Sequence, residues 1–364
     1  MNRSQIVAIL KIVALFGCLY LFIVGIGAMG HSFKLFGKGF SETILSTTAS
    51  PIIGLFIGIL STSLVQSSST TTSIVVGMVA GGVLSIQGAI PIIMGANIGT
   101  TVTNTIVSIG HITRKAEFRR AFSAAVVHDF FNIIAVAILF PLEMTTGFLS
   151  RSATLLAQQF EHVGGMKLGS PLKAATEPTI ELLSDFVSHQ PVFLLILSIL
   201  LIFATLTGMV KLLRSLFIKK VSAFFDEHLF KTALRAFVFG MLLTGLIQSS
   251  SITTSLAVPL VGAGLLTLVQ VFPYTLGSNV GTTITAILAA LSTANTAAIA
   301  VSFAHLLFNI SGIVIIWPVK QIRRIPLLMA SYMAEIVTKN KFLPLLFILL
   351  VFFVIPLTLI VLTR

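Results

Sequence analysis

Long apolar runs constrain the fold of this chain more than any other feature. Runs of about 20 residues lie near 6–29, 191–216, 295–318 and 342–362. Each is long enough to cross a hydrocarbon layer about 30 Å thick as an α-helix. Only 9% of the residues are charged, whereas a soluble protein carries roughly 25%. The sequence therefore predicts an all-α polytopic membrane protein whose first run is a membrane span and not a secretory signal.

The positions of the basic residues indicate how the chain is oriented. The net charge is +12, and the lysines and arginines gather near the start and in 110–121, 211–235 and 319–341. Basic segments between spans tend to face the cytoplasm, so topology accounts for this charge and nucleic acid is not expected as a partner. We therefore expect a multi-pass protein of the cell (inner) membrane. Cys18, the only cysteine, lies in an apolar run, where a packing role is expected.

The second half of the chain repeats the first. QSSSTTTS at 66–73 returns as QSSSITTS at 248–255, and PIIMGANIGTTVTNTI at 91–106 returns as PYTLGSNVGTTITAIL at 273–288. After a shorter loop, His128 and Asn132 match His305 and Asn309. Matching of polar residues, glycines and prolines together indicates an internal duplication.

Counting passes through the membrane predicts that the two repeats are antiparallel, because the first begins with an outward span and the second with an inward one. Inverted repeats are the usual framework of secondary transporters, which bind substrate between the repeats near the midplane. The predicted organisation is an N-terminal span and connecting segment (1–49), the repeat 1 core (50–141), an extracellular linker loop (142–190), repeat 2 (191–318), and a basic segment with a C-terminal span (319–364).

Each QSSS run lies between apolar stretches of 10 to 15 residues, which are too short to span singly. Two such stretches in succession predict a re-entrant helical hairpin with QSSS at its tip, where non-helical backbone is tolerated if protein or water covers it. A tip of this kind presents helix amides to an anion, and carbonyl and side-chain oxygens to a small hard cation. The N-x-G-T-T segments at 97–101 and 279–283 repeat these groups, and their glycine predicts a broken helix in each repeat.

Serine and threonine in membrane helices commonly bond their own helix or a neighbouring one, so a packing role is the better reading for any single hydroxyl. Gln66 and Gln248 are different, since each stands beside three serines and is duplicated. Asp129 alone among the acidic residues lies well inside an apolar segment, and an intramembrane carboxylate is a functional candidate. His128 and His305 are candidates for proton or substrate contacts, with helix packing as an equal alternative.

These motifs, together with VVHDFFN in the first half and HLLFNISGI in the second, closely resemble the type II sodium-dependent phosphate cotransporter family, in a bacterial form. The resemblance covers about 50–140 and 233–318. It implies a sodium-coupled inorganic phosphate symporter, not an enzyme, that takes up phosphate electrogenically by alternating access. It further implies that Asp129 holds an additional sodium ion, although Ser123 stands where many electrogenic members have alanine.

The resemblance and the motifs together assign the site residues. The expected phosphate-binding residues are Gln66, Ser67, Ser68, Ser69, Gln248, Ser249, Ser250 and Ser251. The expected sodium-binding residues are Thr71, Thr72, Asn97, Thr100, Thr101, Asn104, Asp129, Asn132, Thr253, Thr254, Asn279, Thr282, Thr283 and Asn309. No catalytic residue and no cofactor are expected. The partners are phosphate, co-transported Na+ and the lipid bilayer, and the oligomeric state is left open, a dimer included.

Three alternatives remain at this point. The chain could export phosphate or carry another oxyanion such as arsenate. It could be a membrane scaffold, in which case sodium and phosphate would not change its thermal stability. It could be an intramembrane serine hydrolase, but His128 and Asp129 are adjacent and point about 100° apart on a helix, and there is no G-x-S-x-G elbow.

Overall fold

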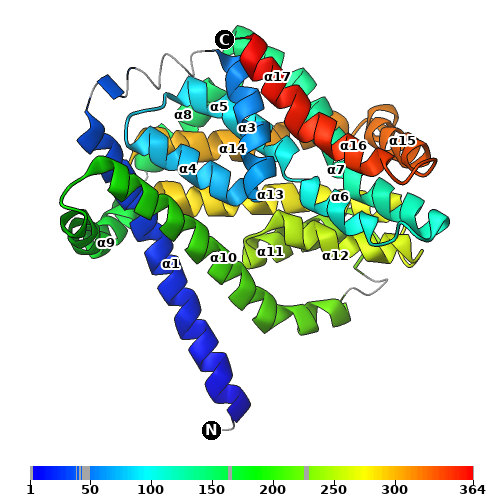
Figure 1. The fold of residues 1–364 in the computed structure, drawn as a ribbon, viewed down its shortest axis with the longest axis horizontal. Coiled ribbons are helices and arrows are strands. Elements are labelled where there is room, and N and C mark those ends of the chain that lie inside the picture. The colour runs from blue at the N-terminus through cyan, green and yellow to red at the C-terminus, as the bar shows by residue number, and fades with distance from the viewer. Residues whose placement is uncertain are drawn as a thin grey trace.

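Every regular element in the described part of the chain is helical. The computed structural model describes residues 3–37, 39–40, 42, 50–162, 166–224 and 229–363, so 38, 41 and 43–49 of the predicted connecting segment lie outside it. The predicted all-α fold class is confirmed (Figure 1). The helices are α1 (Arg3–Phe36), α3 (Pro51–Val65), α4 (Ser68–Ala80), α5 (Ile86–Gly99), α6 (Val102–Ile109), α7 (Lys115–Thr146), α8 (Phe148–His162), α9 (Met166–Phe186), α10 (Pro191–Phe224), α11 (Ala233–Ile247), α12 (Ser250–Gly262), α13 (Leu268–Thr293), α14 (Thr296–Ile316), α15 (Lys320–Val337), α16 (Leu343–Leu349), the π-helical turn η1 (Leu350–Val354) and α17 (Ile355–Leu362).

Six stretches of the described chain are long and apolar enough to cross a membrane. They are Gln5–Phe36, Ile86–Ile109, Lys115–Thr146, Pro191–Leu213, Thr296–Ile316 and Leu343–Leu362. The stretch formed by α5 and α6 is mostly buried inside the protein, whereas the N-terminal and C-terminal stretches expose most of their side chains. The chain is therefore a multi-pass membrane protein with central helices enclosed by outer ones.

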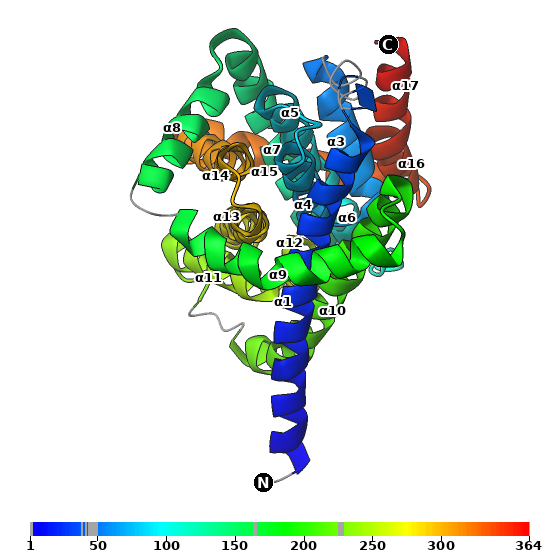
Figure 2. The ribbon, with the colours of Figure 1, turned by 90° about the vertical axis from the view of Figure 1, so that its left-hand side faces the viewer.

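The N-terminal half of α1 extends away from the rest of the protein. Figures 1 and 2 show this half of the helix beyond the other elements, from both directions. Leu10, Val13 and Phe16 are more than 60% exposed there. Farther along, α1 packs closely on α10, where Gly25 meets Ile202 and the carbonyl of Ser198. Side chains this apolar suit a lipid environment around the projecting half.

Four apolar helices are too short to span a membrane. They are α3, α4, α11 and α12, which have 13 or 15 residues. At 1.5 Å per residue such a helix is only about 20–22 Å long, less than the hydrocarbon thickness of about 30 Å. These are the limbs of the two predicted hairpins. Their length agrees with the re-entrant passage, which stays a prediction.

The two repeats pack by matching contacts. α3 lies along α5, and α11 lies along α13. In both pairs the backbones touch at glycines: a Cβ added to Gly58 or Gly95 would overlap carbonyl oxygens of Ile92 or Leu55. Gly240 and Gly277 meet the carbonyls of Tyr274 and Phe237 in the same way. The repeated glycines therefore allow an equally close helix crossing in each half.

Contacts between the repeats are also reciprocal. α4 of the first repeat packs on α13 of the second, while α12 packs on α6 and α7. α8, which follows α7, packs on α14, and α15, which follows α14, packs on α7. Each repeat thus covers part of the other, and the buried residues Ser68, Ser69, Gln248, Ser250 and Ser251 of the two QSSS segments lie between them.

The segment 142–190 was expected to be an external linker loop, and that expectation of loop structure is wrong. Its described residues form the end of α7, then α8 and α9. Glu143 explains the first corner, because its carboxylate accepts hydrogen bonds from the backbone amides of Leu149 (2.6 Å) and Ser150 (3.3 Å) at the start of α8. Leu149, Ala153 and Ala157 form a buried stripe that holds α8 against the bundle.

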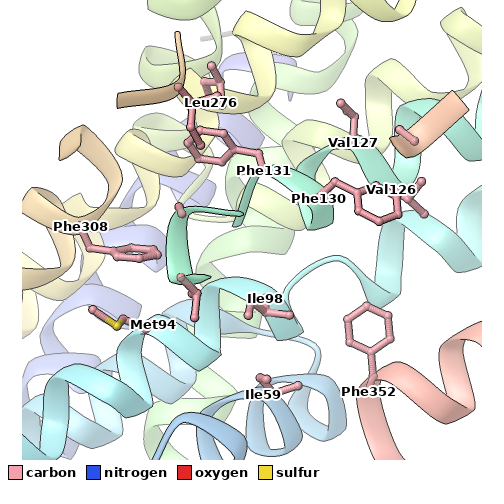
Figure 3. Close-up of a cluster of buried hydrophobic side chains, with 14 of the residues drawn as sticks. Ile59, Met94, Ile98, Val126, Val127, Phe130, Phe131, Leu276, Phe308 and Phe352 are labelled. Atoms are coloured by element: carbon pink, nitrogen blue, oxygen red, sulfur yellow. The ribbon is translucent and has the colours of Figure 1, made fainter. Parts of the chain in front are cut away.

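The main hydrophobic core lies beside the junction of the repeats. It joins α3, α5, α7, α13, α14 and the C-terminal helices. Figure 3 shows side chains of these elements converging, among them Phe131 near Leu276 and Phe308 near Met94. Burial of apolar groups of this size holds both repeats as one packed unit.

Candidate functional site

The helix pairs α3–α4 and α11–α12 are interrupted at the same two residues. Gln66 ends α3 in the left-handed region (φ 54°, ψ 29°), and Ser67 is extended before α4 begins. Gln248 (φ 58°, ψ 26°) and Ser249 do the same between α11 and α12. We call Gln66–Ser69 the first tip and Gln248–Ser251 the second tip. The non-helical backbone predicted at both QSSS runs is confirmed for Gln66–Ser67 and Gln248–Ser249, whereas the last two serines of each run are already helical.

Each tip exposes polar groups that a continuous helix would have paired. The Oγ of Ser67 accepts from the backbone amide of Thr70 (3.2 Å), and the Oγ of Ser249 accepts from that of Ile252 (3.4 Å). The backbone amides of the first residues of α4 and α12 have no partner within their helix, and they carry the positive end of the helix dipole. A left-handed non-glycine residue costs about 1–3 kcal/mol, and this position usually favours glycine. A glutamine here keeps a side-chain amide at each tip.

The two tips line one cavity of about 200 Å³. Side chains of α10 and α6 complete the lining, and none of the described residues around the cavity is charged. The predicted residues that line it are Gln66, Ser67, Ser69, Gln248, Ser249 and Ser251. The other lining residues are Val65, Thr70, Thr103, Phe203, Leu206, Thr207, Val210 and Ile252. The sequence predictions did not include these, although Thr103 and its match Thr285 were visible in the repeated G-T-T-x-T segments.

Hydrogen bonds join the tips across the repeats. Ser69 Oγ donates to the carbonyl of Gln248 (3.4 Å), and Ser251 Oγ donates to the carbonyl of Thr100 (3.4 Å). Ser68 and Ser250, also predicted to bind phosphate, begin α4 and α12; both are buried, and neither lines the cavity. Of the three matched serine pairs, Ser67 with Ser249 and Ser69 with Ser251 line the cavity, and Ser68 with Ser250 does not.

The threonines predicted as sodium ligands are buried, and their hydroxyls donate to carbonyls three or four residues earlier in the chain. This is the packing arrangement common in membrane helices, although a donating hydroxyl keeps its oxygen lone pairs for a cation. The residues are Thr71, Thr72, Thr100, Thr101, Thr253, Thr254, Thr282 and Thr283. None of them lines the cavity.

The predicted asparagines fall into two groups. Asn104 bonds Thr254 across α6 and α12 at 2.8 Å. The others form the asparagine–histidine network, which joins α5, α7, α13 and α14. Asn132 donates to the carbonyl of Asn97 (2.8 Å), and Asn279 donates to Asn132 Oδ1 (2.9 Å) and also contacts His128. His305 and Asn309 each contact Asn97 Oδ1 at 3.4 Å. This network links the repeats through their matched histidines, away from the cavity lining.

Asp129 is fully buried on α7, and neither of its carboxylate oxygens has a hydrogen-bond partner among the described residues. Ala125, one turn earlier, packs with Val258 of α12 and Val107 of α6. Residues four apart share a helix face, so Asp129 lies on the face that meets α6 and α12. A buried unpaired carboxylate is unfavourable, and a bound cation would relieve it.

The predicted broken helix is present in only one repeat. The first repeat is interrupted at Thr100–Thr101, between α5 and α6. In the second, α13 runs unbroken through Asn279 and Thr283, so the prediction is wrong there. The contacts of the opposite tip differ at these places: Ser251 donates to the carbonyl of Thr100 at the break, whereas the matching Ser69 donates to the carbonyl of Gln248 and not to α13.

A sequence comparison decides the family. The family model described as Na+/Pi-cotransporter matches residues 21–169 and 200–354, well over half of the chain. The chain belongs to the Na+/Pi-cotransporter family. The predicted resemblance is confirmed, and the family comprises transporters and not enzymes.

Individual relatives agree with this assignment. Human sodium-dependent phosphate transport protein 2B is 32% identical over 96% of this chain and 64% of its own length. Sheep protein 2A is 34% identical over 97% of this chain and 68% of its own, and rat protein 2A is 34% identical over 96% and 67%. The chain thus spans just under two thirds of the human relative. No solved structure matches the chain.

Proposed function

We propose that this chain is a sodium-coupled symporter for inorganic phosphate. The observation that carries the proposal is the meeting of the two tips in one uncharged cavity. The names of its relatives, which are sodium-dependent phosphate transport proteins, support the choice of both ions. The described residues contribute no lysine or arginine to the lining, so a bound phosphate needs another source of positive charge.

Helix ends and hydroxyls supply part of that charge. The first amides of α4 and α12 would face the phosphate oxygens, and Ser69 and Ser251 would donate to them. Sodium ions supply the rest. The carbonyls left free where α3 and α11 end, with the tip hydroxyls and glutamine oxygens, form the kind of oxygen cluster that holds Na+ in transporters with broken helices. Phosphate would then bind tightly only when sodium is present, which is the basis of coupling.

Asp129 would hold an additional sodium ion. Its carboxylate is buried without a partner beside α6 and α12, where Asn104 and Thr254 also lie. One more cation per cycle would make transport electrogenic. The tips would reach alternate sides of the membrane by a movement of one repeat against the other, as inverted-repeat transporters do.

Uptake into liposomes tests the proposal. Purified protein would be reconstituted, and phosphate uptake measured with the sodium gradient and the membrane voltage imposed independently. We expect an inward sodium gradient to drive uptake and inside-negative voltage to increase it. Uptake that is indifferent to sodium would refute the mechanism. Arsenate and sulfate as competitors, and loaded vesicles with the gradients reversed, would distinguish carriers of other oxyanions and exporters.

The Asp129 role has its own test. Asp129→Gly should abolish the transport current and leave some electroneutral phosphate uptake, because only the additional sodium would be lost. An unchanged current would refute this role without touching the proposal that phosphate and sodium share the tip cavity.

A further inference from the structure

The repeats contain a matched glutamine–threonine pair that differs in bonding. Gln66 and Thr103 in the first repeat correspond to Gln248 and Thr285 in the second, since the distance along the chain from Gln66 to Gln248 equals that from Thr103 to Thr285. The two glutamines have nearly equal backbone angles. Any difference between the pairs therefore lies in their side chains.

In the second repeat the pair is closed. Thr285 Oγ1 donates to Gln248 Oε1 at 2.7 Å, and Gln248 Nε2 donates to the carbonyl of Gly245. Gln248 is 7% exposed. Both ends of its amide are thus fixed, and one orientation of the side chain is selected.

In the first repeat the pair is open. Gln66 is exposed, and its side-chain amide has no hydrogen-bond partner among the described residues, whereas its backbone amide donates to the carbonyl of Thr62 (2.7 Å). Thr103 Oγ1 is buried, and it has no hydrogen-bond partner in the described part of the chain. A buried donor without an acceptor is unfavourable, so this hydroxyl needs a partner that the observed arrangement does not provide.

Gln66 and Thr103 both line the cavity between the tips. We infer that Thr103 is a positioning residue for Gln66, and that Gln66 turns inward to accept its hydrogen bond when sodium and phosphate fill the cavity. The first tip then adopts the side-chain arrangement that the second tip already has. The inference rests on the proposed function, and it assigns to Thr103 a role in closing the first tip over its ligands.

A double-mutant cycle in proteoliposomes tests this inference. The variants are Thr103→Val, Gln66→Ala and both together, with phosphate uptake driven by a sodium gradient. We expect Thr103→Val to raise the KM for phosphate roughly three- to tenfold, the worth of one hydrogen bond, and to change kcat little. The double variant should be no worse than Gln66→Ala alone, because Thr103 acts through Gln66.

Two control variants separate positioning from packing. Thr103→Ser keeps the hydroxyl and should restore the KM of the unsubstituted protein. Thr105→Val removes a buried hydroxyl on the same helix that bonds only the carbonyl of Thr101, and it should leave KM unchanged. Additive losses in the double variant would mean that Thr103 contacts the ligand directly, and an unaffected KM in Thr103→Val would mean that it does nothing; either result overturns the inference.

If the unsubstituted protein shows no sodium-driven uptake, the proposed function itself fails, which the uptake assay detects separately.

Discussion

The two tips share one backbone and differ in their side-chain bonding. Gln66 and Gln248 occupy the same left-handed conformation, and each is followed by a serine that caps the next helix. Gln248 is nevertheless buried and bonded to Thr285, whereas Gln66 is exposed. The duplicated sequence thus specifies the turn, and the neighbours of each turn specify how it is held.

The same contrast extends beyond the tips. Thr70 adds a second hydrogen bond to Ser67, where the second repeat has Ile252. Asp129 of α7 corresponds to Leu306 of α14 when the flanking histidines and asparagines are matched. The first repeat therefore carries the extra polar groups, and the second carries the tip whose glutamine is held by hydrogen bonds at both ends of its amide.

The largest expected effect on stability is at the glycines where the matched helix pairs of the two repeats cross. Gly95→Ala and Gly277→Ala each place a Cβ against a backbone carbonyl that cannot move aside easily. Each should lower the free energy of unfolding by about 3 kcal/mol or more and lower the thermal unfolding temperature in detergent. Gly17→Ala, where the added carbon meets nothing, is the control. A large loss at only one of the two glycines would break the match between the repeats.

Asp129→Leu, which copies the second repeat into the first, should remove the transport current. Without sodium it should not lower the unfolding temperature, because replacing a buried, unpaired carboxylate by an apolar group removes a desolvation penalty. Current and melting are measured on the same preparation. Asp185→Asn, an exposed change on α9, is the control. A current that survives would mean that the acidic side chain does not distinguish the repeats in function.

Truncation of the two glutamines should affect stability unequally. Gln248→Ala leaves the hydroxyl of Thr285 without its acceptor and should cost about 1–3 kcal/mol. Gln66→Ala removes an exposed, unbonded side chain and should change stability by less than about 0.5 kcal/mol. Thermal unfolding without sodium or phosphate is the measurement. Equal losses would show that the tips are held alike, contrary to the structure.

The smallest expected effect lies at the corner between α7 and α8. Glu143→Gln weakens the hydrogen bonds that its carboxylate accepts from Leu149 and Ser150, with a loss of about 0.5–1.5 kcal/mol. The exposed Glu181→Gln on α9 should have no effect on unfolding. A Glu143 variant as stable as that control would mean that packing of α8 on α14, and not its cap, fixes the corner.

The sequence predicted the tips well because the signals are local. A polar run between two short apolar stretches can hardly be a continuous span, so the breaks at Gln66 and Gln248 followed from length and composition. The linker between the repeats was harder. Its helices carry mixed charges and scattered small residues, and their apolar stripes become visible only against α14 and α1.

The differences between the repeats could not be predicted, since they arise from contacts across the fold. Thr103 and Thr285 occupy the same place in nearly the same segment, yet only Thr285 meets its glutamine. The tip serines likewise differ in their partners: Ser251 bonds the carbonyl of Thr100 at the break between α5 and α6, whereas Ser69 bonds the carbonyl of Gln248. Local sequence identity carries no information about such partners.

Equilibrium binding of radiolabelled phosphate to the purified protein in sodium tests the central claim most directly, namely that the two tips form one site. We expect a single phosphate per chain, no binding when sodium is replaced by choline, and a marked loss of affinity in both Ser69→Ala and Ser251→Ala. Two phosphates per chain, or full affinity after either substitution, would contradict the claim that both tips hold the same anion.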